Sequence, residues 1–184
     1  MQNVKVWDLF IRLFHASIAI LFLANFLVTE DGGTPHRYLG YILLGLLALR
    51  FIWGFIGSYH ARFTNFTPSK ESVKEHLRRI LFQEKDIHLG HNPLGALMVF
   101  NLLGSLSLIC LTGILAETDM FWGMKWLEEI HEFLANYAMI SVAFHLLGVA
   151  WETKRSKINI VKAMLTGKKS LPSTKEPNGT TIQT

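Results

Sequence analysis

The stretch HEFLANYAMISVAFHLLGVAW, residues 131–151, decides the fold of this chain. Between Phe133 and Trp151 it has no Asp, Glu, Lys or Arg and a single histidine, His145, and it lacks the period-two alternation of a strand. A helix needs roughly 20 apolar residues to cross the hydrocarbon core of a membrane, so this segment is long enough to span one. His131 immediately precedes the span, 14 residues before His145. That spacing is close to four helical turns, so both histidines lie on one face of the helix, about 21 Å apart.

Three further segments have the same apolar character, namely Phe10–Val28, Tyr38–Ile56 and Leu94–Ala116. Half of the 184 residues are hydrophobic and only 17% are charged, against about 25% charged residues in an ordinary soluble domain. This composition excludes a typical soluble enzyme and disfavours nucleic acid as a partner, in spite of the net charge of +4. We therefore expect an all-α fold, an integral membrane four-helix bundle formed by residues 1–169, followed by a disordered cytoplasmic tail at residues 170–184.

The distribution of Lys and Arg predicts how the bundle is oriented. The connection Gly57–Pro93 contains six of them and the segment after Trp151 contains seven, whereas Thr29–Arg37 and Glu117–Glu132 contain one each. Positive residues concentrate on the cytoplasmic side of a membrane protein. Both termini and the long middle connection are therefore predicted to be cytoplasmic.

The middle connection and the tail also contain two predicted short helices. Ser69–Phe82 reads as a basic amphipathic helix on the inner membrane face, because its apolar residues recur at helical spacing. A second short amphipathic helix is expected at Ile158–Leu165. The histidines of the middle connection, His60, His76 and His88, are expected to be solvated.

Four histidines fall into two pairs once the orientation is known. His15 and His145 lie towards the cytoplasmic side, and His36 and His131 lie at the outer ends of their spans. Ionisable residues at membrane depth are costly and mark functional sites. Two histidines on two helices at one depth are what a b-type haem needs as axial ligands, so the chain is expected to bind two haems. The alternative is that these are interfacial or proton-relay histidines. Zinc is a weaker candidate, since it requires three or four ligands close together.

Three further residues are candidates for contact with a cofactor. Arg50 lies 14 residues after His36 and Arg12 lies one turn before His15, so either could pair with a haem propionate or extend to lipid headgroups. His91 begins the third span and could contact a propionate, line a quinone pocket, or cap the helix together with Asn92. Small residues that permit either close helix packing or contact with a flat macrocycle are Gly40, Gly45, Gly104, Ser105, Ser107 and Gly113.

Several motifs make the chain resemble a known family over nearly its whole length, up to Lys169. They are Val6-Trp7-Asp8 leading to Arg12-Leu13-Phe14-His15, His36-x-x-x-Gly40 with Arg50, Gly57-Ser58-x-His60-Ala61-Arg62-Phe63, Gly90-His91-Asn92-Pro93-Leu94-Gly95, and His131-Glu132-x-Leu134-Ala135-Asn136 followed by His145. In these motifs the chain is similar to the bacterial cytochrome b561 family, which includes the cytochrome b subunits of nickel–iron hydrogenases.

The resemblance implies a four-helix membrane cytochrome of the bacterial inner membrane with two b-type haems. Their ligands would be His15 with His145 and His36 with His131. Electrons would pass between a membrane quinone, ubiquinone or menaquinone, and a periplasmic redox partner such as a c-type cytochrome or a hydrogenase. We expect an electron-transfer protein rather than a stand-alone enzyme, with no catalytic nucleophile. The alternative is a quinone-reducing oxidase of a small outer donor such as superoxide. A second copy of the chain, in a homodimer, is a further candidate partner.

Overall fold

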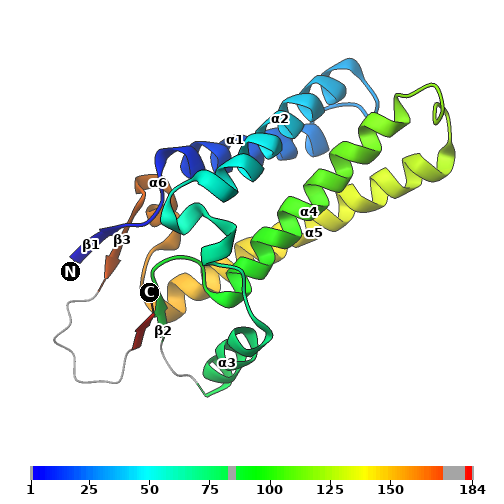
Figure 1. The fold of residues 1–184 in the computed structure, drawn as a ribbon. Coiled ribbons are helices and arrows are strands. Elements are labelled where there is room, and N and C mark those ends of the chain that lie inside the picture. Colours follow the sequence, from blue (N-terminus) through cyan, green and yellow to red (C-terminus); the bar gives the residue numbers. More distant parts are fainter. Residues whose placement is uncertain (1, 83–85, 172–180, 184) are drawn as a thin grey trace.

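Four long helices form the body of the molecule in a computed structural model that describes residues 2–82, 86–171 and 181–183 (Figure 1). They are α1 (Leu9–Leu27), α2 (Thr34–Ile56), α4 (Pro93–Ala116) and α5 (Lys125–Ser156). Each is long and apolar enough to cross a membrane. The prediction of an all-helical, four-span membrane bundle is confirmed. The largest difference lies in α5, which begins eight residues before the predicted span at Phe133, so His131 lies within the helix.

The starts of the helices follow from their local sequence. The carboxylate of Asp8 accepts a hydrogen bond from the backbone N–H of Ile11 at 2.8 Å and so caps α1. Asn92 caps α4 in the same way, through the backbone N–H of Gly95. Proline occupies the first turn of both α2 and α4, where its missing N–H removes no helical hydrogen bond.

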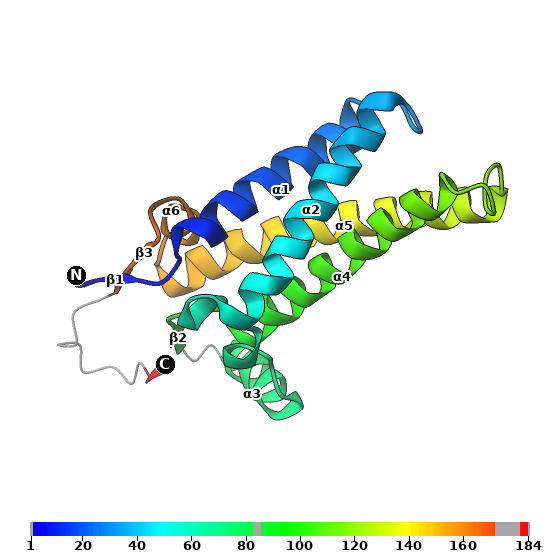
Figure 2. The same cartoon turned by 45° about the horizontal axis from the view of Figure 1, so that its top comes forward.

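The helices pack in the order α1 on α2, α2 on α4, and α4 on α5. Their shared core is apolar and centres on Leu47 and Ala138, both almost completely inaccessible to solvent. Large apolar side chains also cover the outside of the bundle, including Ile20, Ile52 and Phe144. An apolar exterior of this kind suits a lipid environment. Figure 2 shows the same four helices after a 45° turn.

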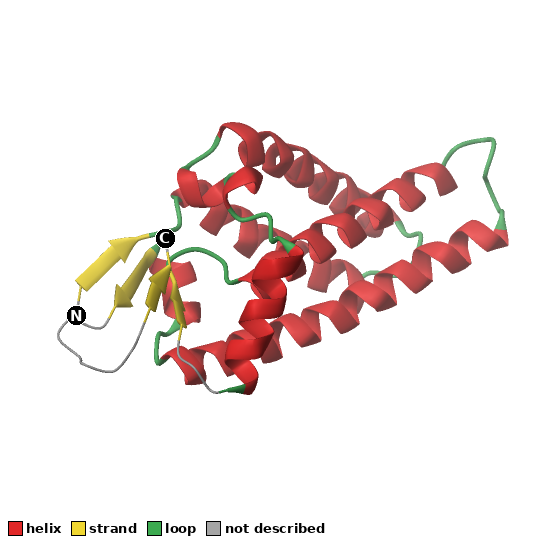
Figure 3. Ribbon diagram, turned by 60° about the horizontal axis from the view of Figure 1, so that its bottom comes forward, coloured by secondary structure: helices red, strands yellow, loops and turns green. Residues whose placement is uncertain are grey.

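All the shorter elements gather at one end of the bundle, together with both ends of the chain (Figures 1 and 3). β1 (Gln2–Lys5) pairs antiparallel with β3 (Lys168–Leu171), and β2 (Asp86–His88) pairs parallel with β4 (Thr181–Gln183). Two 3₁₀ turns, η1 (Tyr59–Ala61) and η2 (Phe63–Asn65), follow α2. The opposite end of the bundle has only the α1–α2 and α4–α5 connections. This arrangement places the two termini and the long middle connection on one side, as the sequence predicted.

The two short amphipathic helices are present as α3 (Lys70–Leu81) and α6 (Ile160–Thr166). The prediction that the histidines of the middle connection are solvated is wrong for His76, which is 2% exposed and packs against the ring of His88. α3 folds back on the bundle, and this buries His76. Within the predicted tail at residues 170–184, Ser170 and Leu171 belong to β3 and Thr181–Gln183 forms β4. Positions 172–180 and 184 lie outside the described residues, and their disorder stays a prediction.

Candidate functional site

Four histidines meet as two pairs at opposite ends of the bundle. The rings of His15 on α1 and His145 on α5 have centroids 6.2 Å apart, at an interplanar angle of 52°. The rings of His36 on α2 and His131 on α5 have centroids 6.0 Å apart, at 65°. The pairs are those that the sequence predicted, and α5 supplies one histidine to each. We call them the inner pair (His15 and His145) and the outer pair (His36 and His131).

The separation within each pair fits a metal ion held between two imidazoles. A bond from imidazole nitrogen to a transition metal is about 2 Å long, and the centre of the ring lies about 1 Å behind the nitrogen. Two rings on opposite sides of one ion therefore have centres about 6 Å apart. No group of three or more His, Cys, Asp or Glu side chains suited to a metal ion occurs among the described residues. The donor set thus suits an ion whose other ligands come from a macrocycle.

Threonine hydroxyls fix the rings of the outer pair. Thr112 Oγ1 lies 2.9 Å from His131 Nδ1 and also donates to backbone carbonyl oxygens of its own helix. Because a hydroxyl has a single proton, Thr112 accepts the hydrogen bond from the Nδ1–H of His131. Thr29 Oγ1 stands in the same relation to His36, 3.3 Å from Nδ1, while it donates to the carbonyl of Asn25. Both rings therefore keep Nε2 available as a metal ligand.

Glycines make room beside the outer pair. A Cβ atom at Gly113 on α4 would lie 3.2 Å from Cε1 of His131, closer than ordinary van der Waals contact. A Cβ at Gly40, one turn after His36, would meet no described atom within 4 Å. The same holds for Gly45 and Gly104. No neighbouring helix therefore fills the space where a Cβ would stand at Gly40, Gly45 or Gly104, although Cys110 Sγ of α4 lies 3.9 Å from the carbonyl oxygen of Gly40. Gly40 lies near the helix face of His36, where a flat macrocycle could approach the backbone.

Arg50 and Arg12 carry donors that the described residues do not satisfy. Arg50 is 3% exposed; its Nη2 donates to the carbonyl of Ala61 at 3.1 Å, and its guanidinium lies over the ring of Phe63. Its Nη1 is buried without a hydrogen-bond partner in the described part of the chain. Arg12 donates through Nη2 to the carbonyl of Leu165, and its Nε is likewise buried and unpartnered there. The carboxylate of Asp8 acts on Arg50 electrostatically but makes no hydrogen bond with these donors in the described residues, so a further anion could bind to them.

His91 lies between two aromatic rings rather than at the cap of α4. Its ring centroid is 4.7 Å from those of both Trp7 and Phe66, while Asn92 alone caps the helix. Nδ1 of His91 is buried and finds no partner among residues 2–82 and 86–171. Burial, reinforced by the positive charges of Lys169 and Arg50, lowers the pKa of His91 to about 3, so the ring is neutral. A cavity of about 170 Å³ adjoins it.

Lys169 is a buried cation beside His91. Its Nζ donates hydrogen bonds to the backbone carbonyls of His88 and Gly90, each at 2.9 Å. These bonds connect β3 to the segment that precedes α4. Burial lowers the pKa of Lys169 to about 8. This role could not be predicted from the sequence, because Lys169 follows Lys168 in a basic segment typical of a solvated surface.

Asp8 is a structural residue at this end, and the sequence points to it only as part of the motif Val6-Trp7-Asp8, without a role. Besides capping α1, its carboxylate accepts hydrogen bonds from Trp53 Nε1, at 3.0 Å, and from the hydroxyl of Ser58. Burial alone would raise the pKa of Asp8, but the hydrogen bonds from Ser58, Ile11 and Trp53 outweigh it and hold the pKa below its ordinary value. Its position just ahead of an apolar run is the signal that could have identified it as a helix cap.

Comparison with known proteins agrees with this geometry. The family model described as "Prokaryotic cytochrome b561" matches residues 6–167, which include all four histidines of the two pairs. No curated protein and no solved structure matches the chain. A family match over most of the chain, on a bundle of four apolar helices, establishes the class of protein. The chain belongs to the prokaryotic cytochrome b561 family, membrane proteins that bind b-type haem and transfer electrons.

Proposed function

We propose that the chain holds two b-type haems, one at the inner pair and one at the outer pair, and passes electrons across the membrane between a quinone and a redox protein outside the cell membrane. The observation that carries the proposal is the spacing of the four histidines, with ring centroids 6.2 and 6.0 Å apart. Each haem, when bound, supplies an iron that accepts and releases a single electron. The residues of the chain hold these groups and set their surroundings.

At the outer pair, His36 and His131 would hold a haem iron through Nε2. Thr29 and Thr112 accept the Nδ1–H of each ring and so keep it in the orientation and tautomer that metal binding needs. Gly113 leaves the space that the ring of His131 occupies against α4. The outer pair is thus positioned by residues of three helices and the α1–α2 connection.

At the inner pair, His15 and His145 would hold the second haem iron. Arg50, Arg12 and His91 would then bind its polar groups. The unpartnered donors of the two arginines suit the carboxylates of haem propionates. His91, neutral and confined between two aromatic rings, completes its hydrogen bonding with a polar group of the inner haem or of a quinone. The cavity beside it is smaller than the roughly 300 Å³ of typical small-molecule pockets, so a quinone at His91 requires that the cavity widen.

The end of the bundle with the outer pair and the α1–α2 and α4–α5 connections favours a protein as electron partner over superoxide. Of the two basic residues in the outer connections, Arg37 is already engaged by Glu117, at 3.6 Å, and Tyr41 donates a hydrogen bond to the same carboxylate. An anionic small donor is attracted by unpaired positive charge. A c-type cytochrome with a basic docking face suits this end better, because the outer connections are mostly acidic. The protein would then act between the quinone pool and a periplasmic electron carrier.

Haem stoichiometry tests the proposal. We expect two haems per purified wild-type chain and one in each of the variants His15→Ala, His36→Ala, His131→Ala and His145→Ala, measured by pyridine haemochrome absorbance against protein. His60→Ala is the matched control, because His60 belongs to neither pair, and it should retain two. Two haems in the His36 variant would refute the outer pair, and a wild type without haem would refute the whole assignment.

A further inference from the structure

An open groove of about 600 Å³ lies where α3 meets the beginning of α4. Its floor is apolar and includes Val73, Leu77 and Leu81 of α3 and Leu97 of α4. Leu77 and Leu97 are each 45% exposed and Leu81 is 80% exposed, so nothing in the described chain covers this floor. The groove belongs to neither histidine pair and lies outside the site described above.

Basic side chains line the same groove. Lys70, Lys74 and Arg78 recur every four residues and so form a stripe along α3. The apolar stripe of Val73, Leu77 and Leu81 runs beside it. The two acidic residues of α3, Glu71 and Glu75, are not among the groove-lining residues. The groove therefore offers a cationic rim over an apolar floor.

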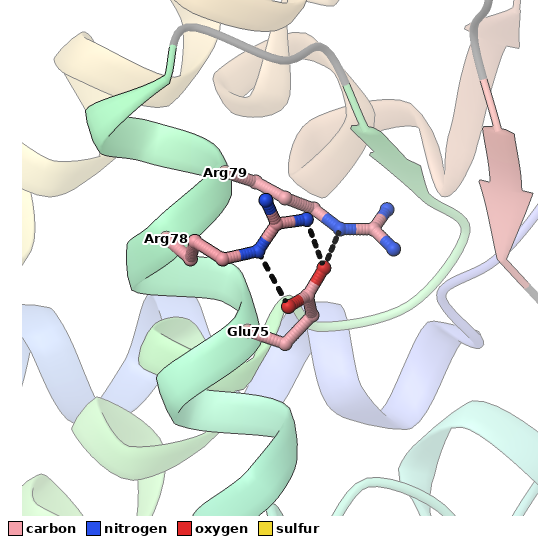
Figure 4. A network of polar contacts seen from close by, with 3 residues as sticks. All are labelled: Glu75, Arg78 and Arg79. Atoms are coloured by element: carbon pink, nitrogen blue, oxygen red, sulfur yellow. Dashed lines mark hydrogen bonds and ion pairs between the residues drawn. The ribbon is translucent and has the colours of Figure 1, made fainter.

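The packing of α3 explains why this face is turned outward. His76 is buried and contacts His88, which anchors the opposite face of the helix to the bundle. Glu75 accepts hydrogen bonds from Arg78, through both its oxygens, and from Arg79, as Figure 4 shows. Arg78 is thereby paired, although the one carboxylate of Glu75 offsets only one of the two arginine charges. Lys70 and Lys74 have no ion-pair partner among the described residues, so they are the uncompensated cations of the rim.

From this arrangement we propose that the groove is a binding site for an anionic phospholipid, whose headgroup phosphate lies at Lys70 and Lys74 and whose acyl chain lies on the floor formed by Leu77, Leu81 and Leu97. Leu97 lies in the first turns of a membrane-spanning helix, so the floor is at the depth where acyl chains begin. The end of the bundle that holds α3 also holds both termini, the end that positive charge assigns to the cytoplasmic leaflet. Anionic lipids attract basic residues close to that surface.

Native mass spectrometry of the full-length, haem-containing protein tests the site. Delipidated protein in a neutral detergent is titrated with phosphatidylglycerol and, separately, with phosphatidylcholine of the same acyl chains. We expect one phosphatidylglycerol to bind with higher affinity than any phosphatidylcholine. The double variant Lys70→Glu/Lys74→Glu should weaken that binding by at least about 30-fold, since each basic residue near the surface contributes about 1 kcal/mol.

Two further variants separate the site from general surface attraction. Lys154→Glu/Lys162→Glu makes the same change of charge at exposed positions at the same end of the bundle, outside the groove, and should bind as the wild type does. Leu97→Trp fills the floor but keeps both lysines, and should also weaken binding. Equal weakening by the two charge-reversal variants, unchanged binding in Leu97→Trp, or equal affinity for both lipids would each overturn the proposal.

Discussion

A Cβ atom at Gly113 would lie 3.2 Å from Cε1 of His131, so the missing side chain on α4 is what admits the ring of His131. Gly113→Ala should therefore displace the ring and lower the occupancy of the outer haem, with a reduced-minus-oxidised absorbance per protein that falls towards half of the wild-type value. Gly104→Ala is the control: it lies nine residues earlier, on the opposite face of α4, and a Cβ there meets nothing within 4 Å. Full haem content in Gly113→Ala would contradict the assignment of His131.

The variant Gly40→Ala tests whether a haem lies against Gly40 or whether the space beside this glycine is simply empty. A Cβ at this position meets no described atom within 4 Å, so Gly40→Ala alone should stabilise α2 by about 1 kcal/mol through helix propensity. If a haem lies against this face, one turn after His36, the alanine should instead reduce haem retention during thermal unfolding. Gly45→Ala, on the far side of the same helix, should retain haem as the wild type does. Equal haem release in the two variants would argue against a macrocycle at Gly40.

Thr112→Val tests how the ring of His131 is oriented. The variant keeps the shape of the side chain but loses the acceptor of the Nδ1–H, so the affinity for one of the two haems should fall by about 10- to 100-fold. The midpoint potential of that haem should shift while the other stays constant, as seen in a redox titration with two components. Ser107→Ala removes a hydroxyl that bonds only its own helix, to the carbonyl of Leu103, and should leave both potentials unchanged.

Arg50 should set the potential of the inner haem. Removal of a buried positive charge near a redox centre favours the oxidised form, which has the larger positive charge, so Arg50→Met should lower the midpoint potential of one haem. Arg62→Met is the control, because Arg62 is exposed and bonds the carbonyl of Gly57 instead. A redox titration in which both variants, or neither, shift a potential would remove Arg50 from the inner site.

The burial of Lys169 should make the stability of the folded protein depend on pH. Because burial lowers its pKa in the folded protein from 10.5 to about 8, the unfolded chain binds the proton more tightly over that interval. The contribution of Lys169 to the free energy of unfolding therefore rises as the pH increases from 8 towards 10.5. Relative to Lys169→Met, the apparent Tm of the wild type should increase by about 5 °C between about pH 7.5 and 9.5. Glu152 opposes the shift, so Glu152→Gln should enlarge the increase.

The four long helices and the two histidine pairs are the features that could be predicted from the sequence. Apolar runs of membrane-spanning length, interrupted by no charge other than Arg12 and Arg50, leave little choice but a helix. The helical repeat then places His131 and His145 on one face. The uneven distribution of Lys and Arg assigns each histidine a depth, and the two pairs follow from the depths. No side-chain contact is needed for any of these steps.

The contacts at the end that holds both termini could not be predicted from the sequence. Asp8 meets Trp53 and Ser58 across 45 and 50 residues of chain, and β1 pairs with a strand more than 160 residues later. These segments are short and polar, with no periodicity to reveal which surface they cover. His76 illustrates the consequence: it stands in a mostly charged stretch, Lys74-Glu75-His76-Leu77-Arg78, and only the docking of α3 buries it.

The position of α5 in the chain has a consequence for biogenesis. α5 is the last of the four long helices, and it supplies one ring to each histidine pair. During synthesis, His15 and His36 enter the membrane early and have no facing histidine until α5 has been translated and inserted. If the two pairs hold haem as proposed, neither haem gains both of its histidines before α5 is inserted, so both centres mature only after the last long helix is in place.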